Sequence, residues 1–307
     1  MTKTLPQQVT IIEVSPRDGL QNESTALPLG RKVKLVESLA QAGLRHIEAG
    51  SFVNPQRVPP MADSDELFSA ITRSPDIVYS ALVPNLRGLK RALAAGVDEV
   101  AVFGAASETF SQRNIQCSIE ESFERFQPVL DEATAAGVRV RGYVSCVVDC
   151  PYEGTISPTA VLRVSERLIE MGCYEVALGD TTGAGTPGSF HELLHLLENT
   201  IPTENLALHC HNTYGQALAN ILVGLEYGVA RIDSAVAGLG GCPYAAGASG
   251  NVATEDVVYM LEGMGIATGL QLDALIDAGH ECCQALGKPN HAMVARALIA
   301  KAQDVAD

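Results

Sequence analysis

Two kinds of apolar segment alternate along this chain, and they differ in the spacing of their apolar residues. This alternation predicts the secondary structure. Short, dense apolar runs predict strands, and the runs that follow them repeat every three or four residues, as amphipathic helices do. The predicted strand and helix pairs are 9–14 with 31–42, 46–51 with 63–71, 78–83 with 86–95, 99–106 with 118–136, 139–147 with 158–171, 175–181 with 187–199, 206–212 with 216–227, and 231–236 with 253–261. The pattern therefore predicts eight βα units.

Glycines at the ends of predicted helices support this division, because helices that lead into a strand commonly stop at a glycine. They are Gly43, Gly96, Gly137, Gly172 and Gly228. Eight units in 307 residues favour an α/β fold of the (βα)8 TIM-barrel type over a doubly wound sheet. We expect a single domain over 1–307, with the barrel at about 9–265 and a helical C-terminal extension at about 266–307.

The net charge limits the binding partners that we expect, and the cysteine content indicates the redox state of the thiols. A formal net charge of -15 argues against binding to nucleic acid or to an anionic membrane surface. No apolar run approaches the length of a bilayer span and no leader precedes Val9, so we expect a cytoplasmic protein. Eight cysteines spread through the chain indicate reduced thiols rather than a disulfide framework.

Two histidines close the seventh predicted strand. His209 and His211 are one residue apart, so strand geometry sends both side chains to the same side. Two imidazoles at a strand end predict half of a metal site, since apolar residues would be the ordinary choice there. The alternative is a pair of structural histidines, each with its own partner.

Other polar residues follow predicted strands at the end where TIM barrels build their sites. Asp18 with the two histidines would give one carboxylate and two imidazoles, and the amide oxygen of Asn251 could complete the set. These ligands suit Mg²⁺ or Mn²⁺ without excluding zinc or iron.

Arg17 would face a carboxylate or a developing enolate of the substrate, or it would form a salt bridge at the rim of the barrel. Cys242 is a candidate reactive thiol or a loop filler.

Two further motifs resemble known sites but are better explained by structure. His191-Glu-Leu-Leu-His195 matches a zinc-protease pattern, yet the apolar stripe of its helix puts both histidines on the polar face. The glycines of 183–188 match a dinucleotide-binding pattern, but the next predicted strand ends in histidines rather than in the expected acidic residue. A βα turn that requires glycines explains that segment better.

The segments 13–23, 141–146, 171–175, 209–211, 236–244 and 250–251 strongly resemble the 3-hydroxy-3-methylglutaryl-CoA lyase family, one of the DRE-TIM metallolyases. The resemblance covers nearly the whole chain, and the loop around Cys242 is specific to the lyase branch. It implies a TIM barrel, a Mg²⁺ or Mn²⁺ ion, an acyl-CoA substrate and a homo-oligomer. The implied reaction yields acetoacetate and acetyl-CoA in the last step of leucine breakdown or in ketone-body formation.

The resemblance also implies roles for individual residues. The metal ligands would be Asp18, His209, His211 and Asn251. Arg17 would stabilise the enolate, Cys242 and His209 would transfer protons, and Glu48 and Asp180 would support the site. Substrate contacts would come from Arg17, Gln21, Asn22, Ser51 and Thr181.

The chain departs from residues common in the family, and this leaves the acyl group open. The departures are Ser24, Asn54, Gln56, Arg57, Asp149, Ala177 and Asn212. A lyase for a related 3-hydroxy-3-alkylglutaryl-CoA and a condensing synthase of the same superfamily are the alternatives.

Overall fold

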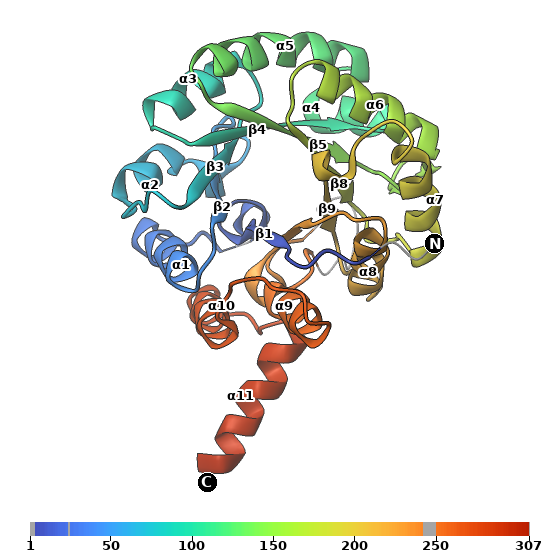
Figure 1. The fold of residues 1–307 in the computed structure, drawn as a ribbon. Coiled ribbons are helices and arrows are strands. Elements are labelled where there is room, and N and C mark those ends of the chain that lie inside the picture. Colours follow the sequence, from blue (N-terminus) through green and yellow to red (C-terminus); the bar gives the residue numbers. More distant parts are fainter. Residues whose placement is uncertain (1–3, 24, 242–249, 307) are drawn as a thin grey trace.

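The computed structural model describes residues 4–23, 25–241 and 250–306. Within them, eight parallel strands close into a barrel, which is ringed by helices in Figure 1. In barrel order the strands are β1 (Thr10–Glu13), β10 (Arg231–Ser234), β9 (Leu206–Cys210), β8 (Glu175–Asp180), β5 (Arg139–Ser145), β4 (Glu99–Ala105), β3 (Val78–Leu82) and β2 (His46–Ser51). The predicted TIM barrel is confirmed.

Each predicted helix is present within a few residues of its expected bounds. The helices of the barrel are α1 (Leu29–Gln41), α2 (Ser64–Ala70), α3 (Leu86–Ala94), α4 (Glu108–Ile115), α5 (Ile119–Ala135), α6 (Pro158–Glu170), α7 (Pro187–Leu197), α8 (Ala217–Glu226) and α9 (Thr254–Gly263), and they are followed by α10 (Leu272–Leu286) and α11 (Met293–Ala306). None of the helices in the described part of the chain is long and apolar enough to cross a membrane.

The predicted glycine stops are confirmed, because all five glycines have positive φ. Gly43 shows a second requirement: a Cβ there would lie 2.7 Å from the carbonyl oxygen of Gly269. This close approach joins the end of α1 to the segment before α10.

Some local structure was not predicted. Helix α4, capped by the Ser107 side chain, and the short hairpin of β6 (Asp149–Cys150) and β7 (Gly154–Thr155) lie between predicted elements and were assigned no secondary structure. Strand β2 has the predicted bounds and contains Glu48. The register of β2 with β3 shifts between Glu48 and Gly50. The side chain of Glu48 therefore lies at an irregularity inside the strand rather than at its end.

The barrel interior contains a charged layer beneath the site. Arg141 of β5 is fully enclosed and reaches Glu175 of β8 at 2.6 Å and Asp233 of β10 at 2.6 Å. Such charges are tolerated in a core because each finds an opposite charge and hydrogen bonds. Above this layer, toward the strand ends, lies a small apolar cluster of Leu82, Ala101, Tyr143, Ala177 and Ala207.

Helix α11 follows α10 and projects away from the barrel in Figure 1. Its first turn is capped by Asp256 of α9, whose carboxylate accepts from the backbone N–H groups of Met293 and Val294. Ala292 and Ala295 are buried against Ala253 and Ile276. These contacts attach the base of α11 to the barrel.

Two buried glutamates hold the short turn that follows β10. The carboxylate of Glu255 accepts from the backbone N–H of Ala237, which has φ 60°, and Glu13 accepts from the N–H of Val236. Burial, together with the neighbouring Glu13 and Asp256 carboxylates, raises the pKa of Glu255 to about 8. Burial also raises the pKa of Glu13. The turn therefore depends on carboxyl groups that keep their protons more readily than exposed ones.

This burial predicts a pH-dependent stability. Between the ordinary glutamate pKa of 4.5 and about 8, the folded protein retains the Glu255 proton that the unfolded chain has lost. The free energy of unfolding should therefore fall as pH rises, by up to about 1.4 kcal/mol per pH unit from this group. Glu255→Gln should flatten the fall in urea titrations between pH 5.5 and 7.5. Glu262→Gln, on the exposed face of α9, is the matched control; equal slopes in both variants would contradict the assignment.

Candidate metal-dependent active site

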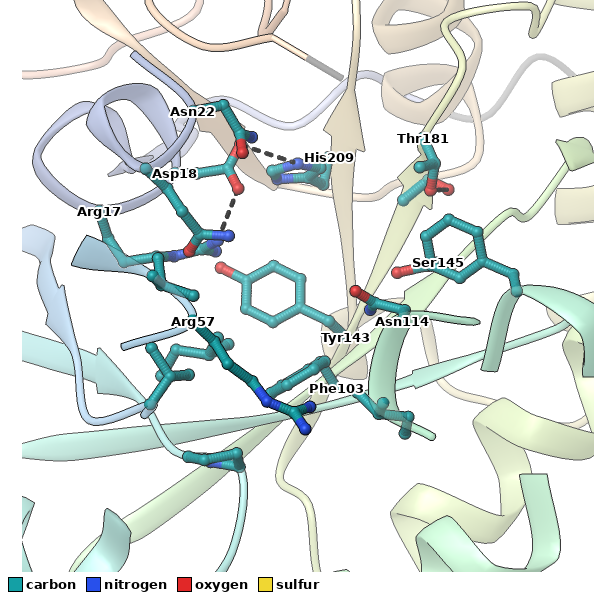
Figure 2. Close-up of a pocket in the computed structure, with 18 of the residues that line it drawn as sticks. Arg17, Asp18, Asn22, Arg57, Phe103, Asn114, Tyr143, Ser145, Thr181 and His209 are labelled. Carbon is teal, nitrogen blue, oxygen red and sulfur yellow. Dashed lines mark hydrogen bonds and ion pairs between the residues drawn. The ribbon is translucent and has the colours of Figure 1, made fainter. Parts of the chain in front are cut away.

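A cavity of about 690 Å³ opens at the carboxyl ends of the barrel strands (Figure 2). The cavity is lined by seven of the predicted site residues: Arg17, Asp18, Gln21, Asn22, Thr181, His209 and His211. Figure 2 shows Asp18 and His209 at one side, with Asn114, Ser145 and Thr181 across the cavity. The structure thus gathers residues from the first, sixth and seventh βα units around one space.

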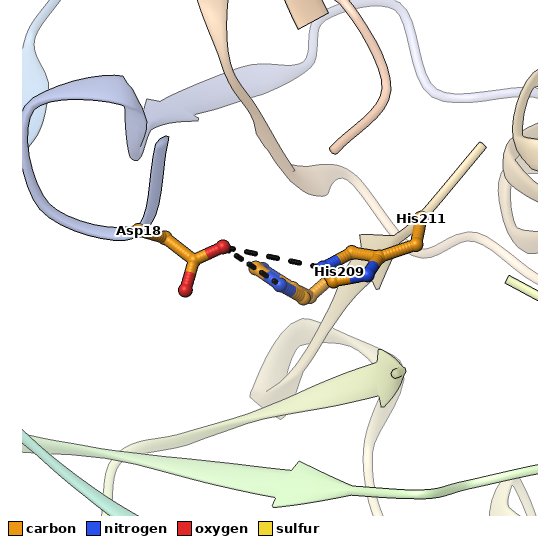
Figure 3. A group of neighbouring side chains, drawn as sticks. All are labelled: Asp18, His209 and His211. Atoms are coloured by element: carbon orange, nitrogen blue, oxygen red, sulfur yellow. Dashed lines mark ion pairs between the residues drawn. The ribbon is translucent and has the colours of Figure 1, made fainter. Parts of the chain in front are cut away.

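Asp18, His209 and His211 converge at one side of this cavity (Figure 3). Both imidazole Nε2 atoms face Oδ2 of Asp18, at 3.9 Å for His209 and 4.0 Å for His211. The two rings lie 5.3 Å apart, so alternation does send both histidines to one side. The described residues contain no second group of three histidine, cysteine or acidic side chains arranged this way.

The turn after β1 places Arg17 and Asp18 beside each other. Residues Ser15–Gly19 form one π-helical turn, closed by the backbone N–H of Gly19, which donates to Val14. Arg17 Nη1 donates to Asp18 at 2.5 Å, and Arg17 Nη2 donates to Glu48 at 2.9 Å. One guanidinium therefore spans the predicted metal ligand and the predicted supporting carboxylate.

Asn251 stands behind Asp18 and has the free atom that a metal ligand requires. Its Nδ2 donates to Asp18 at 2.8 Å and to the carbonyl of Leu239 at 3.1 Å. Its Oδ1 is buried and has no hydrogen-bond partner among the described residues. An isolated bridge pairs His211 with Asn251, which keeps the amide at the triad. A carboxylate, two imidazoles and an unsatisfied amide oxygen fit a divalent cation.

Electrostatics favour the protonation states that metal binding needs. Burial raises the pKa of Asp18, but Arg17 and the two imidazoles outweigh it and hold the pKa at about 2. Burial and the neighbouring His209 lower the pKa of His211 to about 4. At neutral pH the site therefore presents an ionised carboxylate beside an uncharged His211.

Asp233, which was not predicted, orients His209. Its Oδ2 lies 3.1 Å from His209 Nδ1, and the strands are in register at these two residues. The guanidinium of Arg141 holds the same carboxylate by two hydrogen bonds, at 2.6 and 3.0 Å. Despite burial, Arg141 and His209 keep the pKa of Asp233 well below its usual range. The ionised acceptor fixes Nδ1 as the donor and leaves His209 Nε2 available as a ligand.

Tyr143, also not predicted, connects the two arginines. Its hydroxyl donates to Glu48 at 2.7 Å and accepts from Arg141 Nη1 at 2.8 Å. The guanidinium of Arg17 lies 5.5 Å from the centre of its ring, and the ring stands nearly perpendicular to that of His209, at an interplanar angle of 81°. Arg141, Tyr143, Glu175 and Asp233 form one hydrogen-bonded support beneath the site. The sequence signal was the recurrence of ionisable side chains at inward-facing strand positions.

Several predicted residues lie outside the cavity wall. Glu48 and Asn251 stand behind Arg17 and Asp18, whereas Ser51 is fully buried with its N–H bonded to Ser64. Asp180 accepts from the N–H of Gly185, and burial raises its pKa to about 6. Neither Ser51 nor Asp180 is among the residues that line the cavity. Cys242 lies outside the described residues.

The two competing motifs have structural explanations. His191 and His195 are exposed on α7, where His191 contacts the hydroxyl of Tyr227. A Cβ at Gly185 would lie 2.6 Å from Phe190 and 2.7 Å from Asp180, so the glycine is needed for the βα turn itself. Both preferred interpretations are confirmed.

His211→Ala should weaken binding of Mn²⁺ by about 10- to 100-fold in calorimetric titration, because one ligand of a small set is lost. His191→Ala, a histidine outside the cavity, should leave the affinity unchanged. Equal losses in both variants would move the metal site away from Asp18.

Asp233→Asn should also lower Mn²⁺ affinity by about 10-fold or more, because His209 loses the ionised acceptor that fixes its tautomer and an amide can present either a donor or an acceptor to Nδ1. Glu175→Gln is the matched control, since it removes another buried acceptor of Arg141 without touching His209. If Glu175→Gln weakens the metal as strongly, the effect belongs to the packing of Arg141 rather than to the orientation of His209.

Comparison with known proteins places these residues in a family. The family model described as HMGL-like matches residues 8–281. The chain is 56% identical over 294 residues to the hydroxymethylglutaryl-CoA lyase, mitochondrial, of Macaca fascicularis, covering 96% of this chain and 90% of that protein. It is also 56% identical over 298 residues to the 3-hydroxy-3-isohexenylglutaryl-CoA/hydroxy-methylglutaryl-CoA lyase of Pseudomonas aeruginosa, covering 97% of this chain and 99% of that protein.

Solved structures agree with the sequence comparison. The crystal structure of hydroxymethylglutaryl-CoA lyase from Pseudomonas aeruginosa matches with a TM-score of 0.95 at 56% identity, over 97% of this chain and 99% of that one. An Acinetobacter baumannii HMG-CoA lyase in complex with coenzyme A and 3-methylmalate matches at 0.91 and 39% identity, over 96% of both chains. The carboxyl transferase domain of Rhizobium etli pyruvate carboxylase, at 16% identity and 0.69, shares the fold alone. By its sequence, its barrel and its family match, the chain belongs to the HMGL-like family, the family of 3-hydroxy-3-methylglutaryl-CoA lyase.

Proposed function

We propose that this protein is a carbon–carbon lyase that cleaves 3-hydroxy-3-methylglutaryl-CoA to acetoacetate and acetyl-CoA. The observation that carries the proposal is the convergence of Asp18, His209 and His211 beside Arg17 in one cavity. The names of the two relatives support this activity. The complex of the Acinetobacter protein with coenzyme A supports an acyl-CoA substrate.

The ligand set supports magnesium or manganese as the metal. Asp18, His209, His211 and Asn251 would hold the ion, and mixed oxygen and imidazole ligation suits both metals. When bound, a divalent cation lowers the pKa of a coordinated hydroxyl and fixes its orientation.

The reaction breaks the bond between C3 and the carbon next to the thioester. The tertiary hydroxyl loses its proton, a ketone forms at C3, and the electron pair of the broken bond enters the thioester as an enolate. Arg17 is the cation that would face this enolate, and a preorganised charge of this kind contributes most where charge develops. Glu48 and Asp18 hold the guanidinium in place. Protonation of the enolate then gives acetyl-CoA.

The biological setting stays a prediction. Cleavage of this thioester fits leucine breakdown, as the resemblance implies. Relatives include proteins named as mitochondrial and a bacterial one, and the cytoplasm is our expectation for this chain. We likewise expect a homo-oligomer.

The activity is tested by incubating the purified protein with 3-hydroxy-3-methylglutaryl-CoA and measuring acetoacetate, after metal removal and after addition of Mg²⁺ or Mn²⁺. We expect product with either metal and little after chelation. An absence of acetoacetate with both metals, while Mn²⁺ binding is intact, would reject the proposed substrate.

Arg17→Lys should lower kcat by about 100-fold or more, although it retains a positive charge. An ammonium cannot present the planar donor fork, and loss of one preorganised donor to a developing charge costs two or three orders of magnitude. The control is Arg57→Lys, at an exposed arginine of the same cavity, where we expect less than a tenfold change. A near-native kcat for Arg17→Lys would reduce Arg17 to a structural salt bridge.

A further inference from the structure

The connector between α10 and α11, residues 287–292, reaches back to the rim of the cavity. Lys288 Nζ donates to Glu23 Oε1 at 2.5 Å, and the backbone N–H of His291 donates to the carbonyl of Ala237 at 3.0 Å. Glu23 follows the turn after β1, and Ala237 lies in the turn after β10. Because β1 and β10 are paired, the connector joins two neighbouring loops at the carboxyl ends of the strands.

The ion pair between Lys288 and Glu23 is partly shielded from water, since the two side chains are 21% and 13% exposed. No second ion pair joins Glu23 within the part of the chain that the structure describes. Lys288 also has a fixed origin, because its N–H donates to the carbonyl of Cys283 at the end of α10. Shielded charges attract more strongly than exposed ones, and removal of one leaves the other poorly compensated. Lys288 therefore determines where the Glu23 carboxylate lies.

Glu23 ends a short segment, residues 20–23, that contributes to the cavity wall. Its N–H donates to the carbonyl of Leu20 at 3.2 Å, which closes the segment as one turn. The two residues between them, Gln21 and Asn22, both line the cavity. Asn22 Nδ2 donates to the carbonyl of Gly241 at 3.1 Å, so the segment also supports the stem of the loop after β10.

The side chains of this turn are placed to meet a ligand. Gln21 Oε1 is buried and has no hydrogen-bond partner among the described residues. A buried acceptor of this kind is costly unless a donor from a ligand or from water satisfies it. In Figure 2, Asn22 lies on the side of the cavity that holds Asp18 and His209. A shift of the turn would therefore change the cavity next to the metal ligands.

We propose that Lys288 is a positioning residue of the active site, which acts through Glu23 to hold residues 20–23 against the substrate. This role rests on the proposed lyase function and brings a residue of the C-terminal extension into the site. Lys288 does not line the cavity, so it has no direct contact with the reacting groups. Without the ion pair, the turn would have to be ordered when the substrate binds, and that ordering reduces affinity.

The test is Lys288→Met, which removes the charge and keeps a long side chain. KM for 3-hydroxy-3-methylglutaryl-CoA should rise by about fivefold or more, with kcat within about twofold of the wild type, as for a loss of uniform binding. Mn²⁺ affinity should not change, because Asp18 keeps its bonds to Arg17 and Asn251. Glu23→Gln should give the same result and covers a folding failure of the first variant. The double variant should lose no more than either single variant, because both residues act through one pair.

Lys34→Met is the matched control. Lys34 Nζ donates to Glu281 Oε1 of α10 at the same 2.5 Å, but neither residue lines the cavity. KM should stay within about twofold of the wild type, as expected for an exposed pair. Hydrogen–deuterium exchange supplies a readout that needs no turnover: the peptide that contains residues 20–23 should exchange faster in Lys288→Met and at the wild-type rate in Lys34→Met.

The positioning role of Lys288 is rejected if Lys288→Met and Glu23→Gln both keep the wild-type KM, or if Lys34→Met raises KM as much as they do. Faster exchange without a change in KM also rejects it, because the ion pair would then serve folding alone. A wild type that releases no acetoacetate rejects the proposed function instead. Exchange of residues 20–23 still tests the ion pair in that case, so the two failures are distinguishable.

Discussion

The site depends on the contacts that the buried carboxylate of Asp233 makes with Arg141 and His209. This carboxylate accepts two hydrogen bonds from Arg141 and lies 3.1 Å from His209 Nδ1, so it links the charged layer of the barrel to a metal-ligand candidate. A lone carboxylate in this position would carry a large desolvation cost, which Arg141 offsets. Because Arg141 is itself held by Glu175 and Tyr143, the orientation of one imidazole is specified by side chains from three other strands.

The charges around the cavity favour binding of a metal cation first and of an anionic substrate afterwards. Arg17 and Arg141 carry two positive charges against the three carboxylates of Asp18, Glu48 and Asp233, while Glu175 has a further partner in Arg231. A buried excess of negative charge is unfavourable until a cation balances it. A divalent ion would reverse the sign, leaving a site suited to a substrate that carries a carboxylate. This arrangement of charges would therefore favour binding of the metal before binding of the substrate.

Periodicity was sufficient to predict the eight strands of the barrel and the helices that alternate with them, α4 excepted, because a strand and an amphipathic helix differ in the spacing of their apolar residues. Pairing between distant strands was the missing information. Asp180 lies at the end of a predicted strand, close to where Asp18 follows one, yet the strand register pairs Gly179 with His209 and Asp180 with Cys210. Gly179 therefore faces the cavity and Asp180 faces the helix layer. Asp233 was missed for the same reason, since only strand pairing shows that it stands beside His209.

Gly240 and Gly250, which stand on either side of residues 242–249, lie against each other. A Cβ at Gly250 would lie only 2.5 Å from the backbone of Gly240, and Asn22 and Asn212 bond to the carbonyls of Gly241 and Gly250. The entropic cost of closing a loop grows only slowly with its length when its ends are already adjacent. The contact between Gly240 and Gly250 therefore holds Asn251 beside Asp18 without depending on the length of the chain between these two glycines.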